Sequence, residues 1–139
     1  MIGLPSLGQL DRWTSVRIWL ASEPADMRCG FDRLAERAAL VTGQDPLSGH
    51  LFLFRGKGGD RLKILYWDRD GYALWYKRLE EGVFKLPRPP VINAGKEGTA
   101  ASVELRGSEL AMILDGIDLS SVKRGKRYRR PNTNAEPKQ

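Results

Sequence analysis

Residues 62–79 read LKILYWDRDGYALWYKRL, two apolar and aromatic runs separated by the turn residues DRDG at 68–71. Asp-Gly between two strand-like runs is a strong hairpin signal, because glycine adopts the positive φ that a tight turn needs. Side chains two residues apart share one face of a strand. This spacing groups Leu62, Ile64 and Tyr66 in the first run, and Tyr72, Leu74 and Tyr76 in the second. The other face of each run also carries apolar residues, so both faces are expected to be covered.

Three further runs extend this hairpin into a sheet. LFLF at 51–54 precedes the hairpin across the glycine-rich loop 56–60, and completes a three-strand antiparallel meander. Val16, Ile18 and Leu20 alternate onto one face of an earlier strand, and residues 101–105 suggest a fifth. These patterns do not determine the order of the strands.

Two helices are expected beside the sheet. Asp26 is expected to cap the longer one, because its carboxylate can accept a bond from a free backbone N–H. An apolar stripe follows at three- and four-residue steps, formed by Met27, Phe31, Leu34, Ala38 and Val41. Gly43 should end this helix, and a shorter one should run from a Ser108 cap to Gly116. The sequence therefore predicts an α+β fold, with an antiparallel sheet of four to five strands around a central three-strand meander, one long helix and one short helix.

A single domain is expected over residues 13–119, with a flexible leader at 1–12 and a basic, disordered tail at 120–139. The net charge of the 139-residue chain is +6, and six basic side chains with no acidic one fall within residues 123–130. They are Lys123, Arg124, Lys126, Arg127, Arg129 and Arg130. The rest of the chain is thus neutral overall. Such a tail favours a polyanionic partner, and a purely solubilising tail is the alternative.

Composition excludes several classes of protein. No stretch approaches the ~20 apolar residues of a membrane span, and the N-terminus lacks the basic start of a secretion signal. We therefore expect a cytoplasmic protein with no membrane partner. Cys29 is the only cysteine and His50 the only histidine. This excludes an internal disulfide and argues against a structural zinc site.

Candidate catalytic groups are few. Ser48 and His50 lie two residues apart with no third orienting group that the sequence identifies, so His50 is interpreted as a strand-edge residue. Asp68 and Asp70 could ligate a divalent cation, but Asp is also a preferred turn residue before Gly, and we favour the turn. The glycines at 56–59 lack the Gly-Lys-Ser/Thr ending of a phosphate-binding loop. We expect no catalytic, cofactor-binding or metal-binding residues.

Nucleic-acid binding has more support. The six basic side chains of the tail could neutralise six phosphates, which gives log K against log salt a slope of about −5. Tyr128 could stack on a base. Lys63, Arg69, Lys77 and Arg78 could extend the basic surface over the sheet, with ordinary solvent-facing charge as the alternative. Contacts by the tail alone would not distinguish DNA sequences.

Several linked motifs resemble one known family. The segment DMRCGFD at 26–32 comes first, followed by DPLSGHLFLF at 45–54, LKILYWDRDG at 62–71 and WYKRLE at 75–80. Together they resemble the TnpB-type accessory proteins, encoded by the second open reading frame, of the bacterial insertion-sequence family numbered sixty-six. The resemblance covers roughly residues 15–90. The loop 56–60 departs from the basic loop often found there in that family, which weakens the case for a DNA contact at this hairpin tip.

The resemblance implies a protein encoded beside a larger transposase and needed for efficient transposition, with no known catalytic residues. The leading hypothesis is a non-catalytic factor that binds DNA, with the element ends as the expected site, or assists transposase assembly, or does both. The alternative is a module that docks on the cognate transposase through exposed aromatics, without DNA; Trp19, Trp67 and Trp75 suit a core or such an interface. A small metal-dependent nuclease using Asp68 and Asp70 comes third. A homo-oligomer is compatible with all three.

Overall fold

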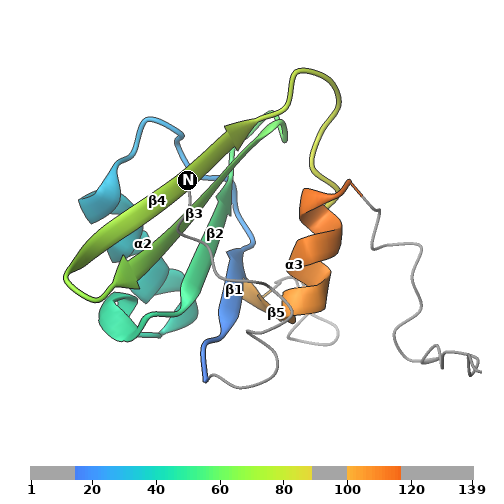
Figure 1. Cartoon of the computed structure of the whole chain (residues 1–139). Helices are drawn as coiled ribbons and strands as arrows, with labels where there is room; N and C mark the ends of the chain where they lie inside the picture. The colour runs from blue at the N-terminus through green and yellow to red at the C-terminus, as the bar shows by residue number, and fades with distance from the viewer. Residues whose placement is uncertain (1–14, 89–99, 117–139) are drawn as a thin grey trace, which may run out of the picture.

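A computed structural model describes residues 15–88 and 100–116, which form one five-stranded sheet with a helix on each side (Figure 1). The strands lie in the order β4-β3-β2-β1-β5. Their bounds are β1 Ile18–Ala21, β2 Leu51–Arg55, β3 Arg61–Asp68, β4 Gly71–Arg78 and β5 Ser102–Leu105. The helices are α2 Phe31–Thr42 and α3 Gly107–Leu114, and a short 3-10 helix, η1, spans Pro46–Ser48. The predicted α+β class, the strand number and the central meander are confirmed.

The sheet is mixed, whereas a wholly antiparallel one was expected. β2, β3 and β4 form the antiparallel meander, and β1 pairs with β5 antiparallel. β1 and β2, however, run parallel, with Ile18 beside Leu51 and Leu20 beside Leu53. The reason is the connection between them, because α2 carries the chain back along the sheet before β2 begins. A helical crossover of this kind is the usual link between parallel neighbours.

Two separate apolar cores cover the two faces of the sheet. On the face that we call the α2 face, Leu34 and Ala38 of the helix pack on Phe52, Phe54 and Leu65. The other, the α3 face, holds a larger buried cluster made by Ile18, Leu20, Leu51, Leu53, Leu62, Ile64, Tyr66, Phe84, Leu105, Leu110 and Ile113. Adjacent side chains of each inner strand therefore enter different cores, which explains the nearly continuous apolar runs of β2 and β3.

The helix ends were only partly predicted. Gly43 ends α2 in the left-handed conformation, as expected. The expected cap at Asp26 is wrong, because α2 begins at Phe31 with Gly30 as its N-cap, and Asp26 instead accepts the backbone N–H of Arg28 in a local turn. Ser108 lies inside α3 and does not cap it. The side chain of Glu109 accepts the backbone N–H of Arg106, which is the N-cap residue.

The strands define two ends of the sheet that differ in their loops. The groove end contains residues 22–30, the β2–β3 loop 56–60 and residues 79–88. The network end contains residues 15–17, 45–50, the β3–β4 turn 69–70 and residues 106–109. α3 runs back along β5, so its last residues, and the departure of the chain toward the tail, lie at the groove end (Figure 1). Neither helix of the described residues is long and apolar enough to cross a membrane.

Candidate nucleic-acid interface

The predicted DNA-contacting residues divide into two groups. Seven belong to the tail, and they lie outside the described residues, as does the predicted leader. The seven are Lys123, Arg124, Lys126, Arg127, Tyr128, Arg129 and Arg130. Of the other candidates, Lys63, Lys77 and Arg78 lie on β3 and β4 toward the groove end. Arg69 is exposed in the β3–β4 turn at the network end.

Lys77 and Arg78 are exposed at the end of β4 and point to opposite faces of the sheet. Lys77 pairs in register with Leu62, which places it on the α3 face, and Arg78 pairs with Arg61 on the α2 face. Two guanidinium side chains directly opposite each other repel, so this pair does not serve stability. Glu80 lies 3.3 Å from one nitrogen of Arg78 and offsets part of the repulsion. The groove end of the hairpin therefore presents positive charge to solvent.

Lys63 has a different role from the one expected, because its side chain is only 6% exposed. Its ammonium donates hydrogen bonds to the carbonyl oxygens of Met27 at 2.7 Å and Cys29 at 3.0 Å. It also lies 4.6 Å from the centre of the Tyr76 ring. Lys63 thus ties the segment before α2 to the sheet and cannot reach a phosphate outside. We do not include it in the proposed contact set.

A groove of about 540 Å³ lies between residues 24–28 and the β2–β3 loop. Arg28, Lys57 and Arg61 line it, together with the carboxylates of Asp26 and Asp60. Arg28 and Asp26 form a two-pronged pair at 2.8 and 3.0 Å. These hydrogen bonds from Arg28 hold the pKa of the Asp26 carboxyl well below its usual range. Sequence reasoning missed the groove, because its two walls are about thirty residues apart in the chain.

Close packing at Gly56 brings the two walls of the groove together. A Cβ atom at this position would lie 2.9 Å from Cγ of Met27, closer than such atoms approach. Glycine therefore allows the Met27 side chain to seat against the loop, and both residues line the groove. The DMR segment and the glycine-rich loop, two separate motifs of the sequence, meet at this contact.

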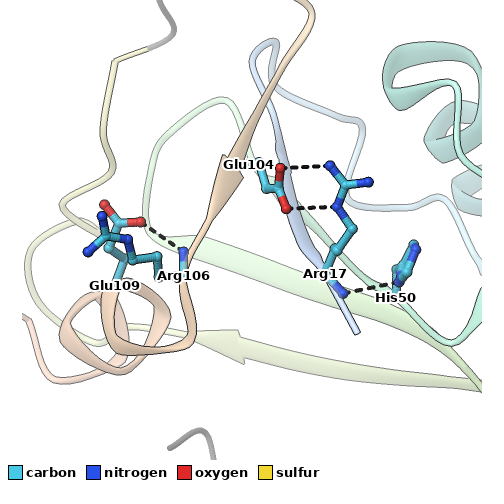
Figure 2. A network of polar contacts seen from close by, with 5 residues as sticks. All are labelled: Arg17, His50, Glu104, Arg106 and Glu109. Carbon is cyan, nitrogen blue, oxygen red and sulfur yellow. Dashed lines mark hydrogen bonds and ion pairs between the residues drawn. The ribbon is translucent and has the colours of Figure 1, made fainter. Parts of the chain in front are cut away.

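The network end contains charges that satisfy one another, as Figure 2 shows. Arg17 donates two hydrogen bonds to Glu104 at 2.8 and 2.9 Å, and its guanidinium lies 4.9 Å from the centre of the Trp19 ring. The backbone N–H of Arg17 donates to Nδ1 of His50 at 3.1 Å. Burial, followed by the nearby Arg17 charge, lowers the pKa of His50 from its ordinary 6.5.

The remaining candidate chemical groups are Ser48, His50, Asp68 and Asp70, all at the network end. The Ser48 hydroxyl accepts the backbone N–H of His50 at 3.2 Å, while the imidazole Nδ1 is engaged by Arg17. Asp68 and Asp70 are exposed at the β3–β4 turn. Within residues 15–88 and 100–116, no three His, Cys, Asp or Glu side chains gather as they would to hold a metal ion.

The aromatic side chains contribute mainly to packing. Trp19 packs on the core of the α2 face and Trp75 on the core of the α3 face, both partly buried. Trp67 meets Tyr72 edge to face, with ring centres 5.1 Å apart. Tyr76, by contrast, is 46% exposed beside Lys63 and Arg61. Its ring is therefore accessible from solvent.

Comparison with known proteins gives the class of this chain, that of insertion-sequence accessory proteins. The model of the family described as IS66 Orf2-like proteins matches residues 16–124. The chain therefore belongs to the IS66 Orf2-like family. It is 40% identical over 104 residues to the uncharacterized protein y4hO of Sinorhizobium fredii (strain NBRC 101917 / NGR234), covering 75% of this chain and 83% of that protein.

A second relative from the same strain gives a longer match. The uncharacterized protein y4jC is 36% identical over 116 residues, which covers 84% of this chain and 91% of that protein. No solved structure matches the chain. The resemblance found in the sequence is thus confirmed at the level of the family.

Proposed function

We propose that this protein is a non-catalytic accessory factor of IS66-type transposition that acts in the cytoplasm, binds DNA at the element ends and assists assembly of the transposase. Family membership supports the role in transposition. The DNA-binding part rests on the six cations of residues 123–130 and on Lys77 and Arg78 at the groove end. Phosphate contacts of this kind supply affinity, while contacts to base edges would supply sequence preference.

The single observation that carries the proposal is the Arg61–Arg78 pair. Cross-strand neighbours of like charge destabilise a sheet, yet Arg61 and Arg78 lie opposite each other on the α2 face at the groove end. A polyanion bound across this end would turn the repulsion into attraction. Duplex DNA is the polyanion that transposition supplies.

Fluorescence anisotropy tests this proposal directly. The purified full chain is titrated with a duplex of the element's terminal repeat and with a shuffled duplex of the same length, over a salt series. We expect tighter binding to the repeat, and a slope of log K against log salt of about −5 or steeper. Equal affinity for both duplexes would reduce the role to nonspecific tail contacts. No binding at moderate salt would contradict direct DNA binding.

Docking on the transposase without DNA is the second candidate, and exposed apolar side chains favour it. Phe31 is 47% exposed, Leu40 81% and Leu47 51%, all on or next to α2. An exposed apolar side chain can belong to a protein interface, and Leu40 is the most exposed of the three. Calorimetric titration of the transposase into wild type and into Leu40→Lys tests this. A weaker complex with unchanged DNA affinity would support docking, and equal affinity of both forms would argue against it.

A further inference from the structure

We propose that the groove between residues 24–28 and the β2–β3 loop is a binding site for a backbone phosphate of DNA, with Lys57 and Arg61 as its donors. This inference rests on the proposed function and deepens it, because it assigns a contact to the folded body in addition to the tail. The sequence left a phosphate contact at this hairpin tip open, and the departure of the loop from the basic loop of the family weakened the case for it. The structure adds cations from other segments to the same place.

Lys57 and Arg61 are both available to bind a phosphate. Lys57 is exposed at the loop, and Arg61 is half-buried at the start of β3. Within the described part of the chain neither forms an ion pair, and Arg61 makes only a long 3.4 Å hydrogen bond to the Tyr76 hydroxyl. Their positive charges are thus not neutralised by direct contact. Ammonium and guanidinium groups left in this way are suited to phosphate oxygens.

Lys63 is a buried cation behind the groove. Lys63 is bonded to two carbonyl oxygens of the segment that forms one groove wall, and no carboxylate pairs with it in the described residues. Carbonyl dipoles and the Tyr76 ring solvate its ammonium but leave its full unit charge. A charge held at low dielectric is screened less than a surface charge, so it adds positive potential to the adjacent surface.

The two carboxylates of the groove do not cancel this charge. Asp26 is matched by Arg28 through the two-pronged pair, which leaves the pair neutral overall. Asp60 alone then opposes Lys57, Arg61 and the buried Lys63. The groove therefore keeps an excess of positive charge, and its concave shape focuses the field on one bound oxyanion. One phosphodiester carries one negative charge, and successive phosphates along a strand could extend toward Arg78.

The test uses the full chain and the anisotropy titrations described above. The double variant Lys57→Gln/Arg61→Gln removes both donors, and Arg69→Gln/Arg106→Gln removes two exposed cations at the network end. Both variants have the same net charge, so only position differs. Circular dichroism and melting curves verify that both are folded. We expect the groove variant to lose about 2 units of salt slope, affecting repeat and shuffled duplexes equally, with little change in the control.

Direct contact is measured by site-specific crosslinking. A photoreactive group is attached to a cysteine placed by Lys57→Cys, in a Cys29→Ser background, and the same group is attached through Arg69→Cys as the control. Crosslinks to duplex DNA from position 57 and few from position 69 would support the site. If the wild type binds and both double variants have equal salt slopes, the groove is not the phosphate site. Equal crosslinking from positions 57 and 69 would lead to the same conclusion. Neither result would contradict the proposed function. Absence of wild-type binding would overturn both.

Discussion

The two ends of the sheet use their charges in opposite ways. At the network end, Arg17 pairs with Glu104 through two hydrogen bonds, and the side chain of Glu109 caps the helix that starts there. At the groove end, Arg61 faces Arg78 on the neighbouring strand, and Lys63 is buried with no carboxylate partner in the described part of the chain. The network end thus pairs Arg17 with a carboxylate, while the groove end keeps positive charge in excess.

This difference separates residues selected for stability from residues available for binding. A fold gains nothing from an unpaired cation near a second one, so the groove end carries a small cost that the network end avoids. Such a cost is expected where a surface awaits a partner of opposite charge. Substitutions at one end or the other should therefore change stability and DNA affinity separately.

The strongest effect is expected on deleting residues 123–139, which removes the six cations of residues 123–130. We expect the salt slope to fall by about 5 units and the affinity at ~0.1 M salt to fall by about 100-fold or more, because up to six phosphate contacts disappear. Anisotropy titrations measure both. Deletion of residues 131–139 is the matched control, since it keeps all six cations of residues 123–130. Equal losses in both truncations would remove the basic run from the proposal.

Lys63→Met tests whether the buried cation at the groove end stabilises the fold. Methionine keeps the length of the side chain but leaves the carbonyl oxygens of Met27 and Cys29 without their donor. Loss of hydrogen bonds to buried acceptors costs about 1–3 kcal/mol of unfolding free energy, which urea denaturation measures. Lys77→Met, at an exposed site on the next strand, is the control and should change stability little. A stable Lys63→Met protein would show that the bonds to residues 27 and 29 are dispensable.

Arg78→Glu should raise the unfolding free energy and weaken DNA binding. The substitution replaces a repulsive cross-strand pair with an attractive one, and such pairs contribute about 0.2–1 kcal/mol. We therefore expect a higher unfolding free energy and a weaker DNA complex, with a salt slope lower by about 1 unit or more. Arg78→Gln separates loss of the positive charge from the new pair with Arg61. A DNA affinity equal to that of wild type would exclude position 78 from the interface.

The smallest expected effect is a pH dependence at the network end. The pKa of His50 is lower in the folded protein than its ordinary 6.5, mainly because of burial. The unfolded chain therefore binds the proton more readily, and stability should be full above about pH 7 and fall as the pH drops below 6.5. Urea denaturation between pH 5 and pH 8 measures this. His50→Asn, which keeps an acceptor without a titrating group, should flatten that part of the profile, and an unchanged profile would assign the dependence elsewhere.

Local patterns predicted the elements whose contacts are close in sequence. The hairpin at 62–79 follows from alternation and the Asp-Gly turn, and Gly43 marks the end of α2 as expected. The parallel pairing of β1 with β2 could not be derived, because no local pattern states which strands become neighbours across a helix. Strand order was likewise open.

The candidate site was less accessible to sequence reasoning than the fold. Lys63 sits between apolar residues of β3, and alternation alone cannot show that a carbonyl-rich segment around Met27 would bury its ammonium. The groove depends on Gly56 and Met27 meeting from segments that share no sequence pattern. The tail, by contrast, was read from composition alone, and its role stays a prediction.

The inner position of β1 also bears on how the chain folds during synthesis. Of the described strands, β1 leaves the ribosome first, yet Arg17, just before it, pairs with a residue 87 positions later. At ~5–20 residues per second, that partner follows several seconds behind. Until β5 arrives, β1 has an open edge, and pairing across so long a loop is slow. A nascent chain cut short before residue 100 should therefore aggregate, whereas one that reaches α3 should close its sheet and stay dispersed.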